Sequence, residues 1–133
     1  MNNTGEKLIY PDLSYKINGI LFATHNELGP YAREKQIGDV IEKLLKEQEI
    51  PYLRECQIGN SGNVLDFIID NKIILELKSK RFIIRADYEQ TQRYLQATQL
   101  KLAILVNFRT QYLKPIRIVK IDTQFKEKFI KKY

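Results

Sequence analysis

The sequence predicts an α/β fold in which a central mixed β-sheet is flanked by helices. The N-terminal third carries apolar residues at helical spacing, and the chain then changes to short apolar runs separated by Gly-, Asn- and Asp-rich turns. A further helical stretch precedes a nearly continuous apolar run of the kind found in strands that are buried on both faces. The expected order, ααβββαββα, is that of a mixed sheet with helices on its faces.

The expected helices are bounded by proline and glycine signals. The first begins at Tyr10-Pro11-Asp12, because proline is tolerated in a first helical turn, and it ends at Gly29-Pro30. Its apolar stripe recurs at steps of three and four residues, through Leu13, Ile17, Ile20, Leu21, Thr24 and Leu28. Three more helices are expected, over about 31–48, from Arg85 or Asp87 to Thr98, and over a short Lys-rich stretch from about Gln124.

Five strands complete the expected fold, at residues 52–58, 64–69, 73–78, 100–107 and 116–121. The first three are joined by Gly59–Asn63 and Asp70–Lys72, which are short and rich in residues that accept positive φ. They should therefore form an antiparallel meander. We interpret residues 1–133 as a single domain with its core at about 12–121.

The composition is that of a soluble globular protein, and its charge is unevenly divided. No apolar run has the length of a membrane-spanning helix, and Cys56 is the only cysteine, which fits the cytoplasm. Residues 1–77 hold 8 Lys and Arg against 12 Asp and Glu, a net charge of −4, whereas residues 78–133 hold 14 against 4, a net charge of +10. A solvated charged surface is one explanation. The asymmetry favours a polyanion bound by the C-terminal half.

Two neighbouring strands carry acidic side chains in apolar surroundings. Side chains alternate across a strand, so Glu76 and Lys78 of the third strand share one face. On the second strand, Leu65 and Phe67 are expected on one face and Asp66 on the other. A short hairpin joins these strands, and we therefore expect Asp66 beside Glu76, with both acids and the lysine on one face.

This arrangement indicates metal-dependent hydrolysis of phosphodiesters. Buried carboxylates are costly without a compensating charge, which a hard cation such as Mg²⁺ or Mn²⁺ supplies. Asp66 and Glu76 would hold the ion, and the backbone carbonyl of Leu77 could add a ligand. Lys78 could then orient or deprotonate the attacking water and meet the phosphate. The alternative is a surface ion pair between Glu76 and Lys78, with Asp66 unrelated.

Four collinear stretches carry a resemblance to a known family: His25–Pro30, Ile73–Lys78, Gln90–Thr98 and Ala103–Phe108. Together with Asp66 they resemble the PD-(D/E)xK nuclease superfamily, which has a restriction-endonuclease-like core, and within it the small stand-alone GxxExxY proteins. The resemblance spans about residues 12–121. There are departures: Tyr31 and Ile37 stand where that group has Gly and Tyr, and Leu65 stands where the superfamily has Pro.

The resemblance implies roles for two residues of the N-terminal helices. Glu34 lies three residues before Ile37 on the apolar stripe of the second helix, where an acid could simply favour the helix dipole. In the superfamily an acid near this point helps to hold or orient the metal. His25, the only histidine, resembles by its order the histidine that RecB-type members place on the metal; a helix-surface or core-edge role is the alternative.

The resemblance also implies a nucleic-acid interface on the third helix. Gln90 and Tyr94 are one helical turn apart and resemble the Gln-x-x-x-Tyr pair, which contacts the nucleic-acid strand in RecB-like nucleases. Lys80, Arg81 and Arg93 surround this region in sequence and are candidates for phosphate binding, although solvated charges are an equal alternative.

The sequence therefore predicts a Mg²⁺- or Mn²⁺-dependent nuclease, with DNA the expected nucleic acid and no membrane partner. One alternative is a module that keeps the fold and binds nucleic acid without turnover. Another is a dimeric junction-resolving endonuclease, since so short a chain has little room for a separate recognition domain and would draw specificity from loops, a homodimer or a partner protein.

Overall fold

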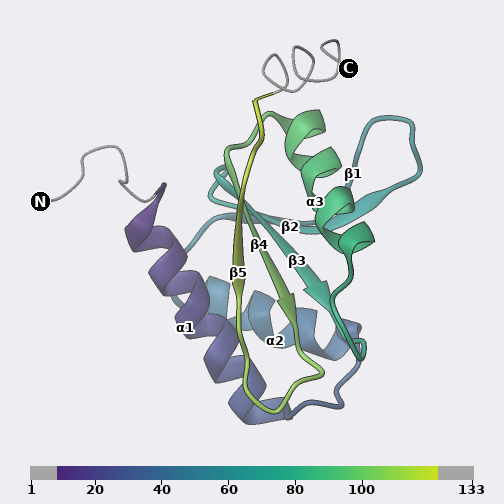
Figure 1. Ribbon diagram of the computed structural model, residues 1–133. Coiled ribbons are helices and arrows are strands. Elements are labelled where there is room, and N and C mark those ends of the chain that lie inside the picture. Colours follow the sequence, from purple (N-terminus) through teal and green to yellow (C-terminus); the bar gives the residue numbers. More distant parts are fainter. Residues whose placement is uncertain (1–8, 123–133) are drawn as a thin grey trace, which may run out of the picture.

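Five strands form a mixed sheet in the order β1-β2-β3-β4-β5 (Figure 1). The computed structural model of the chain describes residues 9–122. The first three strands form an antiparallel meander, β4 runs parallel to β3, and β5 returns antiparallel to β4. The strands are β1 (Tyr52–Gln57), β2 (Val64–Ile69), β3 (Ile73–Lys78), β4 (Leu102–Asn107) and β5 (Ile116–Val119).

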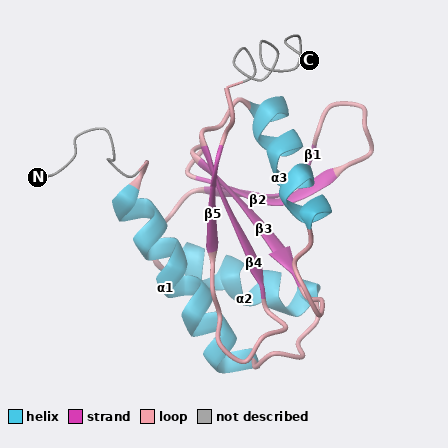
Figure 2. Cartoon of the chain, viewed as in Figure 1, coloured by secondary structure: helices cyan, strands magenta, loops and turns pink. Residues whose placement is uncertain are grey.

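In the described part of the chain, three helices cover the two faces of this sheet (Figure 2). Helices α1 (Pro11–Leu28) and α2 (Glu34–Glu47) pack on one face, where the larger apolar core lies. Helix α3 (Arg85–Thr98) packs on the other face over a smaller apolar cluster. Because β3 and β4 are parallel, the chain must cross over between them, and α3 is that crossover. All six residues of β4 are buried, as expected for a strand covered on both faces.

The predicted α/β class and the order of elements through β5 are confirmed, but some boundaries are shifted. Strand β4 begins at Leu102 and not at Leu100, and β5 ends at Val119 and not at Ile121. The second helix begins at Glu34 and not near Tyr31. The Gln36 side chain accepts a hydrogen bond from the Arg33 amide at 3.0 Å, which caps the helix at this point. The helix expected from about Gln124 lies outside the described residues. Within residues 9–122, no helix combines the length and the apolar character needed to cross a membrane.

The side chains of β2 do not alternate strictly between the two faces of the sheet, and the exception is one residue. Phe67 belongs to the core beneath α1 and α2, but Leu65 belongs to the cluster beneath α3, so the expectation that the two share a face is wrong. The pairing of β1 with β2 runs through Arg54–Phe67 and Cys56–Leu65. Between these pairs Glu55 has a φ of 56°, outside the β region. This local distortion turns β2 over at Asp66.

Candidate active site

The acidic residues lie where β2 and β3 separate. The two strands pair through Ile69–Ile73, Ile68–Ile74 and Phe67–Leu75. Beyond Phe67–Leu75, β2 continues to pair with β1, and β3 continues to pair with β4. We call this divergence, which Figure 1 shows, the fork. Asp66 and Glu76 are the next residues on either side of it.

The carboxylates of Asp66 and Glu76 accept backbone hydrogen bonds at the fork. The amide of Asp66 donates to Glu76 Oε1 at 2.8 Å, and the amide of Leu77 donates to Asp66 Oδ2 at 2.7 Å. These amides lie past the last recorded β2–β3 pair, and the side chains supply their acceptors. The two acids are therefore brought together by the backbone, as the hairpin between β2 and β3 predicts.

Both acids hold their protons more tightly than usual. Burial raises the pKa of Asp66 to about 6, opposed by the Leu77 amide and increased by the Glu34 charge. Burial, and then the neighbouring charge of Asp66, raise the pKa of Glu76 to about 8. Glu76 is only 3% exposed. Two carboxylates that share a buried place in this way repel each other, and a cation relieves the repulsion.

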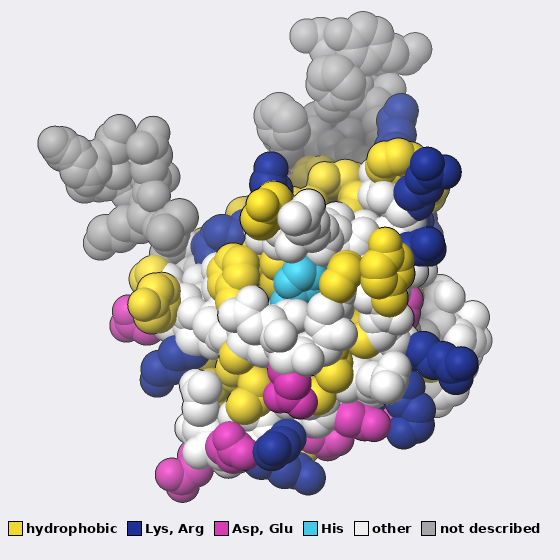
Figure 3. All heavy atoms as spheres, turned by 90° about the horizontal axis from the view of Figure 1, so that it is seen from below, with side chains coloured by type: hydrophobic (Ala, Val, Ile, Leu, Met, Phe, Trp, Pro, Cys, Tyr) yellow, Lys and Arg dark blue, Asp and Glu magenta, His cyan; other side chains and the backbone are white. Residues whose placement is uncertain are grey.

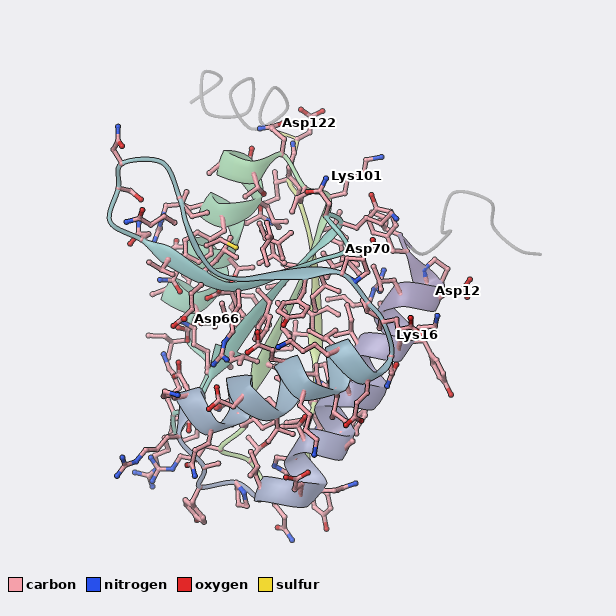
Figure 4. All side chains as sticks on the ribbon, turned by 180° about the vertical axis from the view of Figure 1, so that it is seen from behind. Asp12, Lys16, Asp66, Asp70, Lys101 and Asp122 are labelled. Carbon is pink, nitrogen blue, oxygen red and sulfur yellow. The ribbon has the colours of Figure 1, made fainter. Side chains whose placement is uncertain are left out.

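A hollow of about 300 Å³ opens onto Asp66 from the α2 side, whereas Glu76, on the neighbouring strand, does not line it. We call it the acid hollow. Figure 4 shows Asp66 between the β1–β2 ribbon and the N-terminal end of α2, where the hollow lies. Glu34, the first residue of α2, is exposed and lines its mouth. The residues around it are Glu34, Lys35, Gly38, Asp39, Arg54, Glu55, Asp66, Phe67 and Leu77.

Arg54 of β1 fixes α2 against the sheet and so places Glu34. Its guanidinium donates to Asp39 at 2.8 Å and to Glu42 at 2.9 Å, both on α2. It also lies over the ring of Phe67, 5.6 Å from the centroid. Gly38 makes room for this contact, because a Cβ at that position would collide with the guanidinium.

Lys78 reaches away from the acid hollow toward α3. Its ammonium donates to Gln90 Oε1 at 2.8 Å and lies 3.9 Å from Asp87 Oδ1. Asp87 is 6% exposed, accepts from the Ile84 amide at 2.8 Å and pairs with Lys80 at 2.7 Å. Burial alone would raise the pKa of Asp87, but the Ile84 amide and the Lys80 ammonium hold it below its usual value.

The donor atoms at the fork suit a hard cation that keeps part of its water shell. Within residues 9–122, no three acidic, histidine or cysteine side chains stand close enough together to hold a metal ion by themselves. Mg²⁺ in proteins usually takes one or two carboxylates and completes its shell with water and phosphate. The Asp66–Glu76 pair supplies two carboxylates, and Asp66 and Leu77 line the acid hollow.

The structure gives His25 a different set of contacts. Its Nε2 lies 2.8 Å from the backbone carbonyl of Thr110, and its ring is tilted against Phe108 with 5.7 Å between the centroids. Figure 3 shows the histidine on the lower face of the molecule, with hydrophobic side chains on two sides of it. None of the contacts found for it within residues 9–122 joins it to Asp66 or Glu76.

Of the residues expected to bind nucleic acid, some are buried and others lie on the surface. Tyr94 is 4% exposed, and burial first, then the charges of Glu76 and Asp66, raise its pKa. It therefore packs beneath α3, near the acids. Arg81 lies over the Phe82 ring, 5.7 Å from the centroid. Arg93 lines a separate hollow on the outer side of α3.

Sequence reasoning missed two acids that belong to these surroundings. Glu55 lines the acid hollow, and its charge contributes to the raised pKa of Asp66. Only its distorted φ brings it there, and residue spacing gives no sign of such a distortion. Asp87 links Lys80 to the start of α3. Its place in the first turn of the expected helix, where an acidic side chain can accept a hydrogen bond from the residue before the helix, was the signal that could have identified it.

The fold and the fork define a class of protein: an α/β domain with a buried carboxylate pair and a lysine on adjacent strands. The family model of the PD-(D/E)XK nuclease superfamily matches residues 11–119. The chain therefore belongs to the PD-(D/E)XK nuclease superfamily, which confirms the predicted family. The match does not single out the GxxExxY proteins, so that closer resemblance stays a prediction. No curated protein and no solved structure matches the chain.

Proposed function

We propose that this chain is a Mg²⁺- or Mn²⁺-dependent nuclease that hydrolyses phosphodiester bonds, with DNA as its substrate in a cytoplasmic setting. The observation that carries the proposal is the neighbouring pair of Asp66 and Glu76, with Asp66 lining an open hollow and Glu76 buried beside it. Membership of a nuclease superfamily supports the reaction class. Within residues 9–122 neither acid forms an ion pair, which supports the need for a cation.

Asp66, Glu76 and the carbonyl of Leu77 would hold the ion, and Glu34 would reach it from the mouth of the hollow. When bound, such an ion lowers the pKa of a water molecule and neutralises charge on the phosphate. The protein's own part is to orient these groups: the amides of Asp66 and Leu77 fix both carboxylates.

Lys78 is a cation that this site can offer to the substrate: its ammonium turns toward α3, but its charge opposes the rise in pKa of both Asp66 and Glu76. Gln90 holds its ammonium at 2.8 Å, so the lysine is positioned before substrate arrives. We propose that Lys78 contacts the scissile phosphate or the attacking water, and that Gln90 orients it. Asp87, 3.9 Å from the same ammonium, balances its charge in the free protein.

The test compares an aspartate within β2 with one that follows it. Asp66 lies at the fork, whereas Asp70 is partly exposed just after the last residue of β2 and pairs with Lys72 at 3.0 Å (Figure 4). Asp66→Asn should abolish Mg²⁺- or Mn²⁺-dependent cleavage of labelled DNA, and Asp70→Asn should leave it unchanged. Salt-sensitive binding by a folded wild-type protein that cuts neither DNA nor RNA with either ion would favour the binding-module alternative.

A further inference from the structure

A second hollow adjoins the acid hollow and lies among three connections of the chain. Figure 1 shows the α1–α2, β3–α3 and β4–β5 connections at the same end of the molecule. The hydroxyl of Ser79 donates to the carbonyl of Ala32 at 3.3 Å and so ties two of them together. The hollow measures about 420 Å³. We call it the Tyr31 groove, after its lining of Tyr31, Ala32, Arg33, Glu34, Ser79 and Arg109.

Tyr31 presents an open aromatic face in this groove. Its side chain is 80% exposed. The guanidinium of Arg109 lies over the ring, 5.7 Å from the centroid, and so steadies it. An aromatic ring held in this way is a stacking surface for a nucleic-acid base, and stacking accepts any base because each has a π-face.

The groove also carries positive charge that the described structure leaves unneutralised. Arg33 and Arg109 are both exposed, and neither forms an ion pair with another residue in the range 9–122. Lys80, by contrast, is paired with Asp87. Free arginines beside an aromatic surface are suited to phosphate groups of a strand whose base stacks there.

The groove and the acid hollow share one residue. Glu34 lines both, so a chain of nucleotides that enters the acid hollow can continue into the Tyr31 groove. A base within a duplex is covered on both faces by its neighbours and cannot stack on a protein side chain. Stacking on Tyr31 therefore requires an unpaired base close to the site of cleavage.

We propose that the Tyr31 groove binds an unpaired nucleotide next to the scissile phosphate, with its base on Tyr31 and its phosphates on Arg33 and Arg109. The substrate class is therefore single-stranded nucleic acid, or a duplex with an unpaired segment. This inference rests on the proposed nuclease function, because it takes the acid hollow as the place of cleavage.

The test measures nucleic-acid binding in the absence of metal, so that binding in the Tyr31 groove is measured separately from cleavage. Fluorescence anisotropy in EDTA compares labelled single-stranded DNA and RNA with the blunt duplex of the same sequence. We expect tighter binding of a single strand. Tyr31→Ala should weaken that binding about 5- to 100-fold, whereas Tyr31→Phe should retain it. Tyr15→Ala is the matched control, because Tyr15 is 81% exposed on α1 and lies outside both hollows.

Arg109 gives a second measurement. Arg109→Ala should reduce the slope of log affinity against log salt by about 1, as expected for the loss of one phosphate contact. Thermal melts check that each variant is folded.

The inference is overturned if the wild type binds the blunt duplex as tightly as a single strand, or if folded Tyr31→Ala binds as Tyr15→Ala does. Failure of the nuclease proposal is a separate result, in which folded wild type binds through Tyr31 but cuts no strand with Mg²⁺ or Mn²⁺. Tyr31-dependent single-strand binding together with cleavage supports both.

Discussion

The backbone amide of Asp66 donates a hydrogen bond to Oε1 of Glu76 at 2.8 Å, across the point where β2 and β3 part. A carboxylate here takes the place of a carbonyl acceptor from the neighbouring strand. The reciprocal bond, from the amide of Leu77 to Asp66, does the same on the other side. The backbone amides at the point where the two strands part therefore also orient the acids.

This geometry makes the stability of the metal-free protein depend on pH. The pKa values of Asp66 and Glu76 are raised to about 6 and about 8. Folding therefore favours their protonated forms, and the stability present below about pH 4 is lost as the pH rises through 6 and 8. In EDTA, we expect the unfolding free energy to fall between pH 5 and 9 by a few kcal/mol, on the order that such shifts imply.

Manganese should reverse this loss. An ion that binds the ionised carboxylates stabilises the native state most where they are ionised, so the rise in melting temperature with Mn²⁺ should be largest near pH 9. Differential scanning fluorimetry from pH 5 to 9, with EDTA or with Mn²⁺, measures both effects. A Mn²⁺ shift of equal size at every pH would contradict the role of this pair.

Glu76→Gln should separate stability from activity. The amide oxygen can still accept the bond from Asp66, and the buried negative charge is gone. We expect the variant in EDTA at pH 8.5 to be more stable by roughly 1–3 kcal/mol, as when a buried charge is replaced by a neutral group of similar volume. Cleavage should fall at least about a hundredfold.

Glu47→Gln, at the exposed end of α2, is the matched control and should change neither property. Denaturant unfolding and an oligonucleotide cleavage assay provide the two measurements. A Glu76→Gln protein that is less stable than wild type at pH 8.5 would show that the carboxylate is not under electrostatic strain.

Lys78→Met should remove activity and leave the fold intact. The Lys78 side chain is 18% exposed, its ammonium donates to Gln90, and methionine keeps most of its apolar stem. If Lys78 stabilises charge on the phosphate, the cleavage rate should fall about 10²- to 10³-fold. Lys72→Met, which breaks only an exposed ion pair, should cut at the wild-type rate. Equal rates for the two variants would exclude Lys78 from the reaction.

The bounds of the two strands that carry the acids could be predicted to the residue, because the signals for them lie in the strands themselves and in the adjoining turns. The turn Gly59–Asn63 and the apolar alternation mark the bounds of β2 and β3, and the hairpin then places Asp66 opposite Glu76. The start of α2 could not be placed in this way, because the Gln36 cap decides it and the apolar stripe does not show a cap.

Other features depend on partners far away in the sequence. The reversal of Leu65 follows from the φ of Glu55 on another strand, and periodicity assumes a regular pleat. The contact of Lys78 with Gln90 depends on how α3 crosses the sheet. The spacing of a motif can identify the acids at the fork, but it cannot show from which face of the sheet they are accessible to solvent.

Asp87→Asn should weaken the start of α3. The amide oxygen can still cap Ile84, but the buried side chain loses its charge and Lys80 loses its partner. We expect a loss of about 1–2 kcal/mol in unfolding free energy, since Lys80 is partly exposed and solvent screens the pair. Asp12→Asn is the control, an exposed acid in the first turn of α1. Equal stability of the two variants would show that the Asp87 charge is not needed.

His25→Gln tests whether the single histidine is a metal ligand. The Thr110 carbonyl can only accept, so Nε2 carries the proton in this contact, and no contact of His25 within residues 9–122 joins the ring to Asp66 or Glu76. The variant should therefore cut DNA within about threefold of wild type, while losing about 1–3 kcal/mol of stability from the buried hydrogen bond. Cleavage rates and Mn²⁺ titrations of the folded protein decide the matter. A weakening of Mn²⁺ affinity by tenfold or more in a protein that still melts cooperatively would place His25 on the metal, as the resemblance to RecB-type members implies. Nδ1 would then be the ligand, since Nε2 donates to Thr110.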